Sequence, residues 1–113
     1  MDQSALLEKV RKSRESKLTV GAWTFTIKRP TDSEFVEHQQ LRSYELARLY
    51  VIDWAGVTEA DMVKGGASDD VQFSRDLWIE FVNDHPELWD QIFDEILNAY
   101  RGHMENRLAA KKN

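Results

Sequence analysis

Most hydrophobic residues of this chain recur every three or four positions, the spacing of one face of an α-helix. The stripe is clearest over residues 74–110, where it predicts a C-terminal pair of helices. Ser74 caps the first helix, and Pro86 lies in the first turn of the second. A thinner stripe over residues 1–16 predicts an amphipathic helix or a partly ordered arm. Its apolar members are Leu6, Leu7 and Val10.

Residues 17–29 carry a different pattern, in which apolar and polar residues alternate as in a half-buried strand. Gly21 and Ala22 interrupt the alternation with a two-residue loop of the Gly-X type, which favours a type II′ hairpin turn. Pro30 ends the second strand because it has no N–H to donate. This β-hairpin is the only strand pair that the sequence predicts.

The helical pattern returns over residues 31–55 and predicts a central, largely buried helix. Thr31 and Glu34 form a capping box at its start. Residues 56–73 lose the periodicity and predict a polar connection with one short helical turn, which Thr58 and Asp61 cap. The expected fold is therefore mainly α: a single domain of about four helices with one short N-terminal β-hairpin, occupying residues 1–113.

The composition agrees with a small intracellular domain. Of the 113 residues, 42% are hydrophobic, enough for one modest core. No apolar run has the length of a membrane span, and the N-terminus lacks the apolar stretch of a signal peptide. We therefore expect a cytoplasmic protein without a membrane partner. The absence of cysteine excludes a thiolate nucleophile, disulfides and cysteine-bound zinc.

Charge is distributed unevenly around the net value of −5. Residues 1–29 hold seven Lys and Arg against three Asp and Glu, a net of +4, whereas residues 53–95 hold two against twelve, a net of −10. The basic segment is only a weak signal for nucleic acid, because an acidic protein is repelled by phosphates, and nucleic-acid binding is not expected. Two other interpretations are a solvated helical face and head-to-tail contact between copies, which would give a homo-oligomer.

No catalytic or cofactor pattern appears in the chain. The histidines lack partners at the spacing of metal ligands. The run Ser68–Asp70 lacks the alternating oxygen ligands of a calcium loop. There is no nucleotide-binding glycine pattern and no nucleophile elbow. We therefore expect no enzymatic activity, no cofactor and no metal. The three histidines are His38, His85 and His103.

Aromatic residues are the remaining signal, at 11% of the chain. Five of them are expected in the core because large apolar side chains are usually buried: Trp23, Phe25, Tyr44, Phe81 and Phe93. Full burial of all four tryptophans is difficult in so small a domain, and aromatic residues rimmed by carboxylates are typical of a protein-binding surface. The expected partly exposed anchors are Trp54, Trp78 and Trp89.

Several phrases resemble a known family. They are an extended "WTFTIKRPTDSEF", a "WAGVTEAD" segment, a polar Gly-Gly loop, a Phe-Ser opening and a "HPELW" helix start. Together, over about Val20 to Tyr100, they are similar to the tail assembly chaperones of long-tailed bacteriophages and prophages. The resemblance implies a mainly helical, non-catalytic protein that coats the tape measure protein until tail tube subunits polymerise around it. Such chaperones are typically absent from the mature virion.

Genes of this family often yield a longer product by programmed ribosomal frameshifting, and the extension recruits the tail tube protein. Lys111, Lys112 and Asn113 can be encoded by a slippery adenine run, which would suit such a gene. The alternative for these residues is a frayed, solubilising helix end. No catalytic residue and no motif for the tape-measure contact is carried over from the family.

Two functional hypotheses follow. The leading one is a non-enzymatic chaperone that binds amphipathic segments of the tape measure protein in a groove, with residues 56–73 leaving that groove free. The structural alternative for this connection is a loop that only reverses the chain. The second hypothesis is a small phage or host regulator that contacts nucleic acid through the basic segment "EKVRKSRESK".

Overall fold

The computed structural model describes residues 2–112, so the prediction made for Asn113 lies outside the described residues. These residues form six α-helices and three strands, with 57% of the chain helical and 17% in strands. The prediction of about four helices with one hairpin is therefore wrong, and the arrangement is mixed α/β. The elements are α1 (Gln3–Lys12), β1 (Glu15–Val20), β2 (Trp23–Lys28), α2 (Asp32–Glu37), α3 (Ser43–Tyr50), β3 (Val51–Ala55), α4 (Glu59–Met62), α5 (Arg75–Asn83), the 3-10 turn η1 (Pro86–Leu88) and α6 (Trp89–Lys112).

The predicted hairpin forms the first two strands of an antiparallel sheet with the order β1-β2-β3. Gly21 has a φ of +60° whereas Ala22 does not have a positive φ, which is the pattern of a type II′ turn. The pairing of β1 and β2 extends from Glu15 opposite Lys28 to Val20 opposite Trp23. The hairpin prediction is confirmed, and β1 begins two residues earlier than expected.

The predicted central helix over residues 31–55 is wrong. Its capping box is present, since the Glu34 N–H donates to Thr31 Oγ1 and the Thr31 N–H donates to Glu34 Oε1. The helix that begins there, α2, nevertheless ends at Glu37. After a short loop the chain forms α3, and the last five residues of the predicted helix are the strand β3.

Pairing with β2 explains why residues 51–55 form a strand. Val51 and Trp54 are buried and occupy positions three apart, a spacing that fits a helix as well as a strand with a bulge. β2 carries the buried residues Phe25 and Ile27. β3 pairs with the edge of β2 that β1 leaves free, and Trp54 lies opposite Phe25. The register shifts between Thr26 and Ile27, which accommodates the extra residue.

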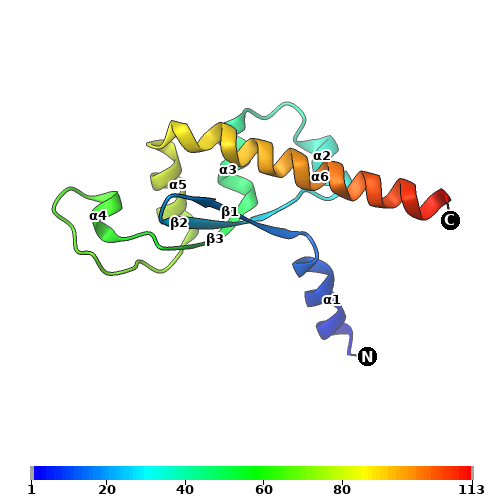
Figure 1. Cartoon of the computed structure of the whole chain (residues 1–113), viewed down its shortest axis with the longest axis horizontal. Coiled ribbons are helices and arrows are strands. Elements are labelled where there is room, and N and C mark those ends of the chain that lie inside the picture. Colours follow the sequence, from blue (N-terminus) through cyan, green and yellow to red (C-terminus); the bar gives the residue numbers. More distant parts are fainter. Residues whose placement is uncertain (1, 113) are drawn as a thin grey trace.

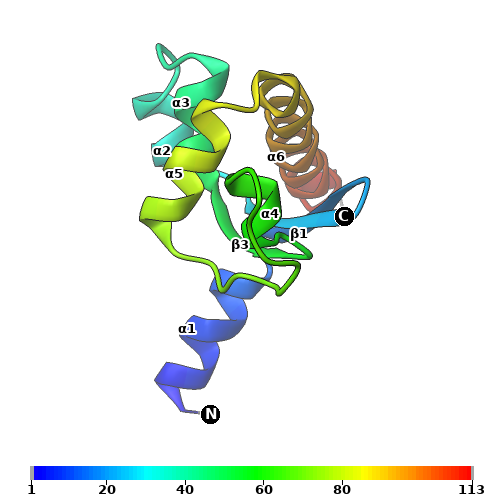
Figure 2. The ribbon, with the colours of Figure 1, turned by 90° about the vertical axis from the view of Figure 1, so that its left-hand side faces the viewer.

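The core lies between the sheet and the helices α3, α5 and α6 (Figure 1). In the view along the molecule, α6 covers one side of the sheet, and α3 and α5 stand beside it (Figure 2). α1 projects away from this body. The largest fully buried side chains are Trp78, Tyr50, Phe25, Ile27, Leu88, Ile92, Val51, Val57 and Val82.

The connection over residues 56–73 forms a closed lobe. The Val71 N–H donates to the Val57 carbonyl at 2.8 Å, and Trp54 Nε1 donates to the Val71 carbonyl at 2.7 Å, so the two ends of the lobe meet. Within it, Thr58 and Asp61 form the predicted cap of α4. Asp61 also accepts from the indole of Trp23 at 3.0 Å, which ties the lobe to the hairpin.

Candidate functional site

An apolar groove lies between α2, α3 and α6 and encloses a cavity of about 190 Å³. It is separate from the lobe over residues 56–73. Such a concave apolar surface is the usual form of a site that accepts side chains of a partner. The groove is lined by Pro30, Phe35, His38, Gln39, Leu41, Leu46, Tyr50, Phe93, Ile96 and Leu97.

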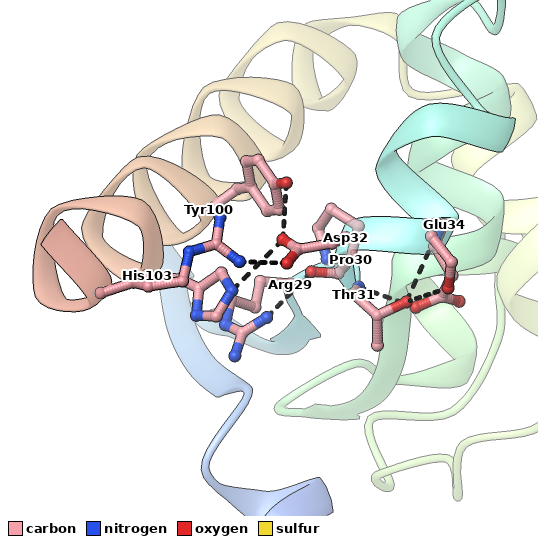
Figure 3. Close-up of polar contacts among 9 residues, drawn as sticks. Arg29, Pro30, Thr31, Asp32, Glu34, Tyr100 and His103 are labelled. Carbon is pink, nitrogen blue, oxygen red and sulfur yellow. Dashed lines mark hydrogen bonds and ion pairs between the residues drawn. The ribbon is translucent and has the colours of Figure 1, made fainter. Parts of the chain in front are cut away.

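One wall of this groove is held in place by contacts between the start of α2 and α6 (Figure 3). Tyr100 donates its hydroxyl proton to Asp32 at 2.8 Å, His103 Nε2 lies 3.3 Å from the same carboxylate, and Arg107 also pairs with it. Beneath them the ring of Phe35 stacks on Tyr100 with centroids 4.2 Å apart. These contacts place α2 against α6 and keep the groove open beside Phe35.

Asp32 stays ionised in this arrangement. The hydrogen bond from Tyr100, followed by that from Arg107, lowers the pKa of the Asp32 carboxyl from 3.8 to about 2. The carboxylate lies on the surface, so solvent screens its attraction to Arg107. Its role is to orient α2, whose first residue it is.

The floor of the groove contains one polar pair. The Tyr50 hydroxyl and His38 Nδ1 are 2.6 Å apart, and the Tyr50 side chain is buried. Burial raises the pKa of the Tyr50 phenol well above its usual range, and the nearby carboxylates of Glu34 and Glu37 raise it further. The phenol therefore remains protonated, and its O–H is available as a donor to the imidazole.

Carboxylates border the apolar lining. Glu37 lies close enough to Tyr50 to affect its pKa and is itself exposed. On α6, Asp90 and Asp94 are exposed and precede the lining residues Phe93 and Leu97 by three positions, which places each one turn away on the same side of the helix. From these positions we infer that the mostly apolar groove has an acidic border near Phe93.

The apolar stripe of α6 continues past the body of the domain. Met104 and Leu108 follow Phe93, Leu97 and Tyr100 at helical spacing and are exposed. The last turns of α6 project beyond the rest of the molecule (Figure 1). The groove and these exposed residues lie on the same face of α6 by helical spacing, with the largely buried Tyr100 between them.

The tryptophans that the sequence indicated as surface anchors lie elsewhere. Trp78 is 0% exposed and Trp54 is 7% exposed, so the expectation that these two are partly exposed is wrong. Their rings lie 6.3 Å apart within the core. Trp89 is half-buried against Tyr44, and its Nε1 donates to the Val82 carbonyl at 2.7 Å.

Hydrogen bonding explains how the domain buries these rings. Trp78 Nε1 donates to the Ala47 carbonyl at 3.0 Å, so its polar atom is satisfied inside the core. None of the three tryptophans lines the groove. Among the aromatic residues assigned to the core, Phe25 and Phe81 are buried, whereas Trp23, Tyr44 and Phe93 are partly exposed.

The length of the apolar stripe on α6 indicated the groove, but the sequence-based prediction placed the binding surface at the tryptophans instead. The apolar stripe of α6 runs from Trp89 to Leu108, longer than one small core can cover. Phe93 and Leu97, at the middle of this stripe, are only half-buried and line the groove. The contribution of α2 had no comparable signal, because the break between α2 and α3 was not predicted.

Comparison with protein-family models, with curated proteins and with solved structures finds no match for this chain. Within residues 2–112, no helix combines the length and apolar composition needed to cross a membrane. Across those same residues, no group of three or more His, Asp and Glu side chains is placed to hold a metal ion.

Proposed function

We propose that the protein is a non-enzymatic phage tail assembly chaperone that binds amphipathic helices of a tape measure protein in the groove between α2, α3 and α6. The observation that carries the proposal is the apolar groove beside Phe93, together with the exposed residues Met104 and Leu108 farther along the same face of α6. An elongated apolar surface with a polar rim accommodates the apolar face of a helix. The phrases that resemble tail assembly chaperones supply the identity of the client.

The remaining parts of this proposal concern the cell. The chaperone acts in the host cytoplasm and leaves before the mature virion is complete. A longer isoform made by frameshifting at the codons for Lys111 to Asn113 would carry an extension that recruits the tail tube protein. The short and long forms then bring client and tube subunits together.

A binding experiment with paired variants tests the groove. Synthetic peptides that tile the tape measure protein are titrated into the full chain and followed by fluorescence anisotropy. Leu97→Asp places a charge in the lining and should weaken binding about thirtyfold, the equivalent of the roughly 2 kcal/mol typical of an interface anchor. Leu77→Asp on α5 is the matched control, because Leu77 is an exposed leucine outside the lining and should bind normally.

Circular dichroism of both variants establishes that the fold is retained. Equal binding by the Leu97 variant and the native chain would exclude the groove as the client site.

The second candidate is a regulator that binds nucleic acid through its basic N-terminal segment. The observation that favours it is the exposure of Lys9 and Arg11 on the projecting α1. Binding to phosphates would weaken steeply as salt rises from about 50 to about 200 mM, whereas capture of an apolar helix would change little. A steep salt dependence with duplex DNA, together with no peptide binding, would favour this candidate.

A further inference from the structure

α1 is an amphipathic helix that packs against no core. None of its ten residues is buried, and its apolar residues Leu6, Leu7 and Val10 are 48%, 49% and 40% exposed. Isolated helices shorter than about 12 to 15 residues are only marginally stable in water, and most helical stability in proteins comes from packing of the apolar face. The stripe on α1 therefore requires a surface outside this body.

The charges of α1 define the kind of surface that fits. At 100° per residue, Lys9 and Arg11 lie on either side of the apolar stripe. The only acidic residue of the helix, Glu8, lies on the opposite side, where it pairs with Lys12 at 3.2 Å. The docking face of α1 is thus apolar with two basic borders.

The groove between α2, α3 and α6 has the complementary composition. Its lining is mostly apolar, and the exposed carboxylates of Glu37, Asp90 and Asp94 lie next to lining residues in the sequence or one helical turn from them. Arg101 lies one turn beyond Leu97, so the acidic part of the rim is the half near Phe93. Complementary charge at a rim selects partners and fixes their register.

The α1 of the same copy does not reach this groove. Only Ser13 and Arg14 separate α1 from β1, and the Arg14 carbonyl accepts from the Arg29 N–H at 2.8 Å, which fixes the link to the sheet. α1 points away from α2, α3 and α6, on the far side of the sheet (Figure 2). The occupant has to come from another molecule.

We propose that α1 of one copy docks in the α2–α3–α6 groove of a second copy, in a reciprocal exchange that forms a two-fold dimer. One ten-residue helix face is small beside the roughly 1,200 Å² of a stable interface, and a reciprocal exchange doubles the buried area. The inference rests on the proposed function in one respect. The groove that α1 covers is the proposed client site, so a client helix would have to displace α1.

Charge reversal on the full chain tests this exchange. Sedimentation velocity measures the dimerisation constant of the native chain, of an arm variant (Lys9→Glu with Arg11→Glu) and of a groove variant (Glu37→Lys with Asp94→Lys). All four positions are exposed, so the fold should tolerate these changes. Each variant should dimerise about tenfold more weakly, because it brings like charges together at two or more rim pairs.

The combined arm and groove variant should dimerise as the native chain does, because the charges are complementary again. Its control is the arm variant combined with Asp69→Lys and Glu80→Lys, two exposed acidic positions outside the lining. This control has the same net charge and should remain weak.

A native chain that is monomeric at every concentration would overturn the exchange, as would a dimer that neither variant weakens. Client peptides are titrated separately into the native chain and the Leu97→Asp variant. If a monomeric chain binds client peptides, the proposed function stands and the exchange fails. If the chain dimerises as predicted but binds no client peptide, the exchange stands and the proposed function fails.

Discussion

Replacing Gly56 with alanine should force the end of β3 away from the β1–β2 turn. Gly56 has a φ of +83°, and a Cβ added there would overlap the carbonyl oxygen of Ala22 and lie 3.3 Å from its carbonyl carbon. A left-handed conformation costs a non-glycine residue about 1–2 kcal/mol. The overlap with a backbone atom adds to this cost because no side-chain rotation relieves it.

Gly65 provides a matched control for the backbone strain alone. Its φ is +81°, nearly that of Gly56, but a Cβ there meets no atom within 4 Å. We expect Gly65→Ala to lower the free energy of unfolding by about 1 kcal/mol and Gly56→Ala by about 3 kcal/mol. At about 4 °C per kcal/mol for a domain of this size, the two melting temperatures should differ by about 8 °C.

Urea unfolding followed by tryptophan fluorescence measures both losses, and circular dichroism at the same urea concentrations tests whether unfolding is two-state. If the free energy of unfolding depends on urea concentration with the same slope in both variants, the difference between them lies in the stability of the native state. Equal losses for the two variants would refute the reasoning, because the close approach of Gly56 to the turn would then have no energetic consequence.

Three further predictions concern the core, the α2–α6 contact and the gene. Trp78→Ala should lower the free energy of unfolding by about 3–5 kcal/mol, as for a fully buried aromatic, and Trp89→Ala by less; equal losses in urea would contradict the difference in burial. The stability that Asp32 contributes should be present above about pH 4 and lost as the pH falls towards 2, because its pKa is lowered from 3.8 to about 2 in the folded chain. Asp32→Asn should lack that part of the acid transition, and an NMR titration of the Asp32 carboxyl with a midpoint near 3.8 would contradict it. The gene should carry an uninterrupted adenine run over the codons for Lys111 to Asn113 and a −1 frame that stays open beyond them; AAG at Lys112 would exclude slippage there.

Features that depend on neighbouring residues could be predicted from the sequence. The caps at Thr31, Thr58 and Ser74 each bond a backbone N–H three residues ahead, as their spacing indicates. The turn at Gly21 likewise follows from a local requirement for a positive φ. The physical reason is that each of these signals involves groups only a few residues apart.

Features that depend on distant partners could not be predicted in this way. The five residues of β3 form a strand because β2, more than twenty positions earlier, presents a free edge, and the helical spacing of Val51 and Trp54 hid that outcome. The burial of Trp78 has the same origin, since the carbonyl that satisfies its indole belongs to Ala47 in α3. The groove also depends on distant contacts, because Asp32 and Phe35 reach Tyr100 across most of the chain.

The helices α1 and α6 both expose apolar residues outside the core, and this is the strongest physical argument for the proposed role in assembly. The 24 residues of α6 span about 36 Å, and the stripe residues Met104 and Leu108 remain exposed at its far end. α1 exposes a second apolar stripe, which basic residues border, whereas acidic residues border the groove. Ordering such segments costs conformational entropy that their own contacts do not repay. Under the two proposals, that cost is offset when another helix, from a second copy or from a client, covers the exposed apolar residues.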